Sequence, residues 1–279
     1  MISFNYLRTN PFLRRIYNIL PIYLKKHYVS AVSFNGVKVW KNSYIYKNQN
    51  KALISIKDKY KGKICIIMGN GPSLLNTDWD LVKRQHVIGL NRINMLRSQM
   101  GFDPEILVVI KDLVIEQFQE DIVQPKSIKF LDFKSGHKIE SLKGLDDTFF
   151  INEKVKIQGG FSKNLVDGWF RGYTVTYAAM QVAYYLGFTK VLLIGVDHNF
   201  KFKGPSRRNI ISDGEDPNHF DPNYFGKGVK WALPDLDGSE QYYKIAKKAF
   251  EDDSREIIDC TVNGKLEVFR KSRLEDELN

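Results

Sequence analysis

The residues best suited to chemistry form a glycine-rich turn that follows the apolar run Ile64–Met68. They are Gly69, Asn70, Gly71, Pro72 and Ser73. An apolar run that ends in glycines is typical of a buried strand, and Pro72 followed by Ser73 can begin a helix. The first N–H groups of a helix lack partners within it and carry partial positive charge. The turn therefore predicts a site for the phosphate of a nucleotide, with glycines that let the backbone approach it.

A dinucleotide-binding turn is the competing interpretation, and two residues argue against it. Leu74 replaces the third glycine of the G-x-G-x-x-G pattern, and the next apolar run, His86–Leu90, ends in Asn91 and not in the acidic residue that binds an adenosine ribose. We therefore do not expect NAD. A tight turn that binds nothing remains open as a third interpretation.

A second candidate site lies in the segment 200–236, a long stretch with little regular pattern that we interpret as an ordered lid. It brings Asp216, His219, Asp221 and Tyr224 close together in sequence. Because imidazole titrates near neutral pH, His219 facing a nucleotide is suited to act as a general base or acid. Two alternatives stay open: His219 caps a turn by bonding the aspartates, or His198 at a strand end has this role.

A third group begins at Arg171 and leads into a predicted helix at 174–186. Together with the hydroxyl groups of Tyr173 and Thr174, the arginine can hold a phosphate and offset its charge as it leaves. A helix that begins with a threonine cap and packs Tyr177 inward is the equal alternative.

Two pairs of aspartates, Asp78 with Asp80 and Asp235 with Asp237, resemble the D-x-D pattern that binds a divalent metal together with a sugar nucleotide. Neither pair follows a convincing core strand. We therefore interpret them as helix-capping carboxylates and predict no metal site.

The elements that position these residues alternate along the chain. Strands are predicted at 64–68, 87–90, 106–110, 128–131, 148–151, 191–195 and 256–260, and helices at 79–83, 174–186 and 239–251. This order predicts an α/β fold, a Rossmann-like, mostly parallel sheet with helices on both faces and a lid insertion. Ligands of such sheets bind beyond the carboxyl ends of the strands. That rule adds the residues after the strands to the predicted donor site: Asn91, Asp112, Asp197 and His198.

The first 60 residues are predicted to form a basic arm, with an irregular polar stretch at 41–61, before one catalytic domain at 61–279. The chain has a net charge of +10, much of it near its start among apolar residues. Such a segment is attracted to an anionic membrane surface, and packing against its own domain is the equal alternative. Nucleic acid is not an expected partner, because the basic residues form no stripe and no binding motif occurs.

No apolar run approaches the ~20 residues that cross a bilayer, so we expect a cytoplasmic protein that can lie on the inner face of the membrane. The two cysteines, Cys65 and Cys260, fall in predicted strands. We expect two buried thiols and neither a disulfide nor a metal pair.

Three segments resemble a known family. They are 69–74, 172–197 and 259–269. They are similar to the domain shared by the flagellin-modifying Maf proteins and the proteins described as 6-hydroxymethylpterin diphosphokinase-like (DUF115). The first two also resemble bacterial sialyltransferases of the Campylobacter lipooligosaccharide type, which have a GT-A-related fold. Those enzymes transfer a nonulosonic acid from a CMP donor with inversion, need no metal, and use a lid histidine as base.

The resemblance implies a role for several residues. The turn from Gly69 to Ser73 would lie against the donor phosphate or ribose, Asn91 would contact the nucleotide, Arg171 would lie near the phosphate, and His219 would be the base. The implied partners are a CMP-linked nucleotide sugar and a cell-surface saccharide, with no cofactor. Two departures are that Arg171 is offset by about one residue and that Lys111-Asp112 stands where the family has an asparagine.

The pterin enzymes imply an alternative, the transfer of pyrophosphate from ATP with Mg²⁺ held by Asp197, Asp213 and Asp216. The long aromatic lid and the basic arm favour the glycosyltransferase, since a free pterin requires neither. A non-catalytic sugar-nucleotide binding protein is the second alternative.

Overall fold

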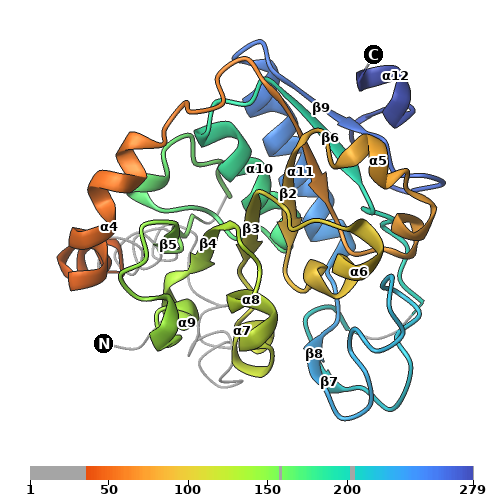
Figure 1. Ribbon diagram of the computed structural model, residues 1–279, viewed down its shortest axis with the longest axis horizontal. Coiled ribbons are helices and arrows are strands. Elements are labelled where there is room, and N and C mark those ends of the chain that lie inside the picture. The colour runs from red at the N-terminus through yellow and green to blue at the C-terminus, as the bar shows by residue number, and fades with distance from the viewer. Residues whose placement is uncertain (1–35, 157–158, 202–204, 279) are drawn as a thin grey trace, which may run out of the picture.

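The computed structural model describes residues 36–156, 159–201 and 205–278. Its centre is an eight-stranded sheet in the order β10-β9-β6-β1-β2-β3-β4-β5, with every neighbouring pair parallel (Figure 1). The strands are β1 (Ile64–Met68), β2 (His86–Leu90), β3 (Ile106–Val109), β4 (Ile128–Asp132), β5 (Thr148–Ile151), β6 (Lys190–Ile194), β9 (Glu256–Asp259) and β10 (Arg270–Lys271). The predicted α/β fold is confirmed. The short strand β10 was not predicted.

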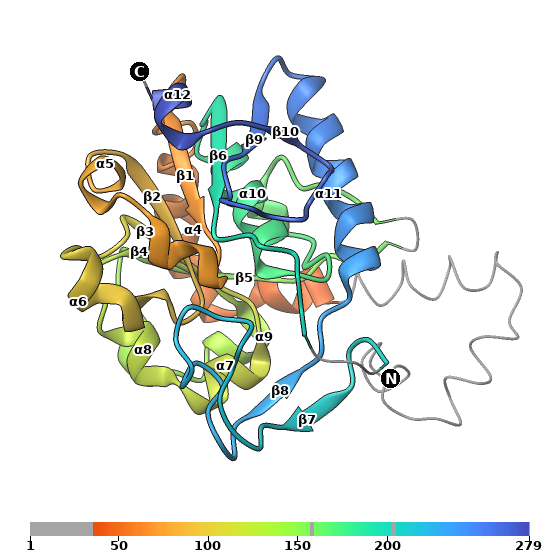
Figure 2. The ribbon, with the colours of Figure 1, turned by 90° about the vertical axis from the view of Figure 1, so that its right-hand side faces the viewer.

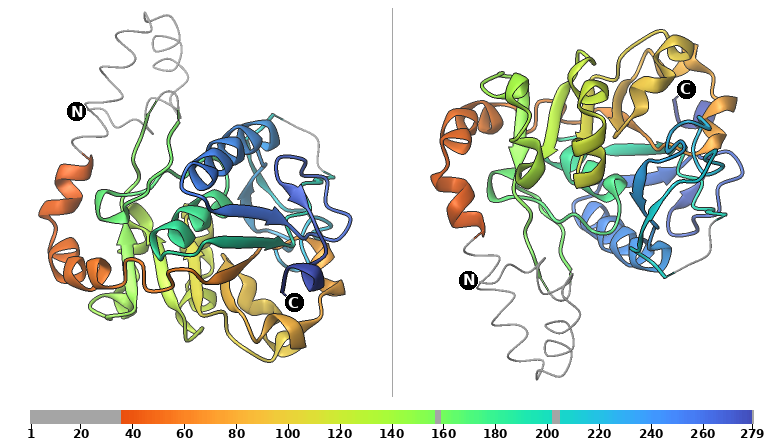
Figure 3. Two further views of the ribbon diagram at one scale, coloured as in Figure 1. Left: turned by 90° about the horizontal axis from the view of Figure 1, so that it is seen from above. Right: turned by 90° about the horizontal axis from the view of Figure 1, so that it is seen from below.

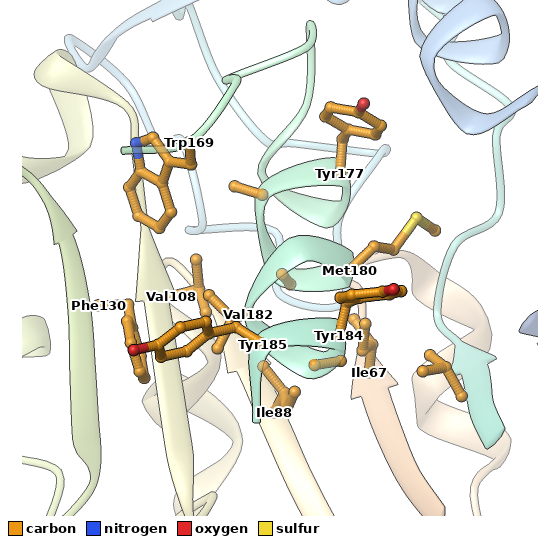
Figure 4. Close-up of a cluster of buried hydrophobic side chains, with 14 of the residues drawn as sticks. Ile67, Ile88, Val108, Phe130, Trp169, Tyr177, Met180, Val182, Tyr184 and Tyr185 are labelled. Carbon is orange, nitrogen blue, oxygen red and sulfur yellow. The ribbon is translucent and has the colours of Figure 1, made fainter. Parts of the chain in front are cut away.

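Alternate residues of each strand point to opposite faces of the sheet, so the domain has two cores. On one face, Ile67, Ile88 and Val108 pack against α10 (Val175–Tyr185), and α11 (Leu236–Glu251) continues this layer (Figure 4). Every residue of α10 is buried, including the polar Thr176 and Gln181, so the helix is enclosed on all sides. Because α10 is packed against the sheet, the position of its first turn relative to the carboxyl ends of the strands is fixed.

Short helices cover the second face of the sheet, so helices lie on both faces (Figure 3). The α-helices here are α5 (Trp79–Val82), α6 (Arg97–Met100), α7 (Asp112–Gln117), α8 (Gln119–Val123) and α9 (Phe133–Gly136), and α12 (Leu274–Leu278) packs near the end of the chain. The 3-10 turns are η1 (Pro72–Asn76), η2 (Ile93–Leu96), η3 (Glu140–Leu142) and η4 (Leu165–Asp167). Some of these helices begin close to the end of the preceding strand: α7 begins shortly after β3, and α9 begins directly after β4.

The irregular stretch predicted at 41–61 is wrong, because most of it is the helix α4 (Tyr44–Ser55), which lies beside β5 (Figure 1). The side-chain amide of Gln49 donates to the carbonyl of Phe150 and accepts from its N–H, both at 2.8 Å. Trp40, which is fully buried, donates to the same carbonyl at 2.9 Å. The described part of the predicted arm therefore packs on the domain.

The basic, apolar segment with the predicted membrane contact lies within residues 1–35 and so outside the described residues. Among the residues that the structure describes, no helix is long and apolar enough to span a bilayer. Cys65 and Cys260 are both free and buried, as predicted. Burial raises the pKa of the Cys260 thiol to about 12.

The lid contains an antiparallel hairpin of β7 (Asn209–Ile211) and β8 (Lys230–Ala232), which the sequence did not predict. Figure 2 shows β8 near α7, where the side chain of Gln117 bonds both the N–H and the carbonyl of Lys230. The N–H of Phe220 donates to the carbonyl of Asn70 at 3.0 Å. The lid is therefore anchored at α7 and at the turn after β1.

Candidate active site

A cavity of about 520 Å³ lies between the lid and the carboxyl ends of β1, β2 and β6. This volume is within the range of small-molecule sites. The residues predicted from sequence that line it are Gly69, Asn70, Gly71, Asn91, Asp112, Arg171, Tyr173, Thr174, Asp197, His198, His219 and Tyr224. Pro72 and Ser73 do not line it. The rule that ligands bind beyond the strand ends therefore located the cavity.

At the start of η1, where the sequence predicts a ligand phosphate, the structure has the carboxylate of Asp197. Both the N–H and the hydroxyl of Ser73 donate to Asp197, at 3.1 and 2.8 Å. A Cβ on Gly71 would lie 1.8 Å from an oxygen of Asp197, so this glycine makes room for the carboxylate. The sequence predicts that Pro72 and Ser73 contact a ligand phosphate; in this structure the N–H and hydroxyl of Ser73 are used by Asp197. Burial raises the pKa of Asp197, against the hydrogen bonds from Ser73, which favour its charged form.

The lid histidine is held by a carboxylate. Nδ1 of His219 lies 2.6 Å from Oδ2 of Asp216, and the aspartate side chain is only 2% exposed. The ring of His219 stacks on Tyr224 with centroids 4.1 Å apart and an angle of 4° between the planes. Because an ionised carboxylate only accepts hydrogen bonds, Nδ1 carries the proton and Nε2 is left as the basic atom. The contact between His219 and a lid aspartate, which the sequence analysis gave as an alternative to a catalytic role, thus also orients the ring.

His198 lies in the cavity wall as well, directly after β6. Its Nε2 is 3.0 Å from a carboxylate oxygen of Glu240 on α11, and its backbone has a φ of +53°. The carboxylate of Glu240 therefore engages the Nε2 atom of His198. In His219, by contrast, the carboxylate engages Nδ1.

Arg171 lies in the cavity wall within a group of carboxylates. It donates to the carbonyl of Ile110 and, at 3.3 Å, to Asp112, and it lies 4.0 Å from both Asp132 and Glu153. These contacts tie the end of β3 to the ends of β4 and β5. Its positive charge is already offset by protein carboxylates, so less of it is available to a phosphate than the sequence suggested.

The two aspartates beside Arg171 differ in protonation. Burial raises the pKa of Asp132 to about 7, although Arg171 favours its charged form. Burial also opposes the charged form of Asp112, but Arg171 and Lys134 outweigh this effect and lower its pKa. The buried carboxyl therefore titrates near neutral pH, whereas Asp112 stays ionised.

Thr174 caps the first turn of α10, as in the alternative that the sequence analysis gave to a phosphate site. The Thr174 hydroxyl accepts from the N–H of Thr176 at 3.3 Å, and the buried Tyr177 donates to the carbonyl of Gly160 at 2.6 Å. Thr174 and Tyr173 nevertheless line the cavity. The guanidinium of Arg207 lies 3.7 Å from the centroid of the Tyr173 ring.

The interpretation of the D-x-D pairs as helix caps is confirmed for the first aspartate of each. Asp78 accepts from the N–H groups of Asp80 and Leu81 at the start of α5. Asp235 accepts from the N–H of Gly238 at the start of α11 and pairs with Arg207 at 2.6 Å.

Three amide side chains of the cavity wall have buried atoms without a hydrogen-bond partner within the described part of the chain. They are Oδ1 of Asn70, Oδ1 of Asn91 and Nδ2 of Asn218. Buried polar atoms normally have partners. These residues line the cavity, and a polar group that reached the three buried atoms would satisfy them. Sequence analysis identified Asn70 and Asn91 but missed Asn218, since one asparagine in a long lid gives no signal.

Further residues at α7 and in the lid also line the cavity, although sequence analysis did not place them among the predicted site residues. They include Lys111, Glu116, Phe200, Phe225, Lys230 and Trp231. Phe225 and Trp231 stack with centroids 5.2 Å apart. Apart from histidines, the charged lining residues are three basic ones (Lys111, Arg171, Lys230) and three acidic ones (Asp112, Glu116, Asp197). The wall is therefore formally neutral.

The comparison with protein families agrees with the resemblance seen in the sequence. The model described as 6-hydroxymethylpterin diphosphokinase MptE-like matches residues 41–203, more than half of the chain. This chain belongs to the MptE-like family. No curated protein matches it. The MptE-like chain is similar to the solved structure of a Maf glycosyltransferase from Magnetospirillum magneticum AMB-1, with a TM-score of 0.48 and 14% identity over 82% of this chain. It spans 38% of the length of that structure.

Magnesium is the metal that the diphosphokinase alternative implies for an MptE-like protein. The candidate ligands were Asp197, Asp213 and Asp216. The carboxylate of Asp197 is bonded by Ser73, and that of Asp216 by His219. In residues 36–156, 159–201 and 205–278, no three His, Cys, Asp or Glu side chains come together in a way that could hold a metal ion. The three aspartates therefore do not form a shared ligand group.

Proposed function

We propose that this MptE-like chain is a metal-independent, inverting glycosyltransferase. It takes a sugar of nonulosonic acid type from a CMP-activated donor and transfers it to a cell-surface saccharide. The observation that carries the proposal is the Asp216–His219 pair in the lid wall of the cavity, with Nε2 of the histidine left as the basic atom. The resemblance of segments 69–74 and 172–197 to sialyltransferases supports the donor.

In the proposed reaction the donor lies against the strand ends and the acceptor enters under the lid. Nε2 of His219 removes the proton of the acceptor hydroxyl. The hydroxyl oxygen bonds to the anomeric carbon of the donor sugar as the bond from that carbon to the phosphate oxygen breaks. CMP leaves with the bonding electrons. Asp216 stabilises the imidazolium that forms. A base and a leaving group on opposite walls suit a single displacement, which inverts the anomeric centre.

The charge of the cavity supports a donor with a single phosphate. The wall has equal numbers of basic and acidic side chains, and Arg171 is surrounded by carboxylates. A triphosphate with its greater negative charge would require more positive charge or a metal ion. The unpartnered atoms of Asn70 and Asn91 are suited to the hydroxyl and amine groups of a nucleoside.

A second candidate is the transfer of pyrophosphate from ATP to a pterin, and the description of the matching family model favours it. The aspartates proposed for its metal do not come together. A non-catalytic binding protein is a weaker candidate, because binding alone does not require a histidine oriented by a buried carboxylate.

A thermal-shift screen of CMP, CDP, UDP, GDP and ATP, each with and without Mg²⁺, tests the proposal. A nucleotide at ~100-fold its dissociation constant stabilises by ~2.7 kcal/mol, which is a shift of a few degrees. We expect cytidine nucleotides to shift the transition without Mg²⁺. A shift by ATP and Mg²⁺ alone would contradict the proposal and support the pyrophosphokinase.

A further inference from the structure

Arg92 is a buried arginine that connects the body of the domain to the lid. It follows Asn91 at the end of β2, and only 8% of it is exposed. Its Nη1 donates to the carbonyl of Tyr224, and its Nε donates to Asp121. The guanidinium carbon lies 3.5 Å from the centroid of the Phe118 ring. The side chain therefore joins β2 to α8 and to the lid through three different contacts.

Tyr224 receives a second contact from the same residue. The backbone N–H of Arg92 points to the tyrosine hydroxyl at 3.5 Å. Tyr224 is 1% exposed, and its ring is the one that stacks on His219. Arg92 thus fixes both the backbone and the ring of the residue against which the imidazole lies. Asp216 holds Nδ1 of the same imidazole.

We propose that Arg92 is a positioning residue for His219 and acts through Tyr224. This inference rests on the proposed function, in which His219 is the base. The planar guanidinium can bond the Tyr224 carbonyl and Asp121 at once while it stacks on Phe118, whereas an ammonium group cannot keep this geometry. Loss of the contact lets the tyrosine ring move and takes the imidazole with it.

The first test is Arg92→Lys, which keeps the charge and loses the planar group. We expect kcat to fall by about 10–100-fold, because small displacements of a catalytic group have effects of that order, and donor affinity to stay within about twofold. Arg97→Lys is the control, since Arg97 on α6 pairs with Asp103 at 3.1 Å and its side chain is 54% exposed. An Arg92→Lys enzyme with unchanged kcat would overturn the inference.

The second test combines Arg92→Lys with His219→Ala. Residues that act through one another are not additive. If Arg92 only positions the imidazole, Arg92→Lys should not lower kcat further once the imidazole is gone. Equal losses in both backgrounds would mean that Arg92 acts on folding or on another group, and would overturn the inference.

The third test needs no substrate. The chain has five histidines, and the ring signals in an NMR spectrum of the full chain identify His219 as the one lost in His219→Ala. Stacking on Tyr224 shifts the ring protons of His219 upfield, and we expect Arg92→Lys to remove that shift while Arg97→Lys keeps it. An unchanged signal overturns the inference. Full turnover by His219→Ala would instead contradict the proposed function. The NMR comparison of Arg92→Lys with Arg97→Lys would still report the position of the His219 ring.

Discussion

Nδ1 of His219 lies 2.6 Å from Oδ2 of Asp216, three positions earlier in the same lid. The short spacing means that the carboxylate that bonds the ring comes from the lid itself. In the proposed reaction the donor lies against the strand ends.

Replacing the histidine tests its role as base. We expect His219→Ala to lower kcat by at least ~10²-fold with little change in nucleotide affinity, because a base acts in the transition state. Steady-state kinetics and calorimetric titration with CMP measure the two quantities. Equal losses of rate and affinity would make His219 a binding residue. An active His219→Ala beside an inactive His198→Ala would transfer the role to His198.

Gly71 tests the packing of the turn after β1. A Cβ there would lie 1.8 Å from Oδ2 of Asp197, so we expect Gly71→Val to lower the free energy of unfolding by about 1–3 kcal/mol or more. Thermal or chemical denaturation measures this change. Gly214→Ala is the control, because a Cβ on Gly214 meets nothing within 4 Å. A fully stable Gly71→Val would show that Asp197 is not held where the structure has it.

The pH dependence of stability tests the buried carboxyl of Asp132. Burial raises its pKa from 3.8 to about 7, so between these values the folded chain keeps a proton that the unfolded chain has lost. Its contribution to stability is complete below the unfolded pKa and is lost as pH rises through the folded pKa. Asp132→Asn keeps a side-chain acceptor for the N–H of Lys134 and removes the titration.

We therefore expect the Tm of the wild type, relative to that of Asp132→Asn, to fall between about pH 4 and pH 7. Melting curves of both proteins across this range give the difference directly. Parallel curves would mean that the carboxyl does not titrate there.

Residues 1–35 test membrane association. If this basic, apolar segment binds anionic lipid, its deletion should abolish binding to vesicles that contain phosphatidylserine and leave turnover of a soluble acceptor unchanged. The binding of the full chain should also weaken at high salt, because the Debye length shrinks to ~3 Å at 1 M. Vesicle sedimentation measures both. Equal binding by the full and shortened chains would exclude the segment as the anchor.

The strands of the fold and much of the cavity wall could be predicted because they depend on local signals. Buried parallel strands appear as apolar runs, and the residues after them meet at one edge of the sheet. The capture of Ser73 by Asp197 could not be predicted, since the two lie 124 positions apart and either could serve a ligand equally well. The helix α4 was missed because its buried face includes a glutamine, Gln49, as well as apolar residues.

The hydrogen bonds between Gln49 and Phe150 also protect the molecule against self-association. β5 is the last strand of its sheet, and an outer strand with free backbone groups is a template for a strand of another molecule. The glutamine amide bonds the N–H and the carbonyl of Phe150 in the manner of a neighbouring strand. We expect a chain shortened beyond Gln49 to uncover this template and to associate with other copies through the edge of β5.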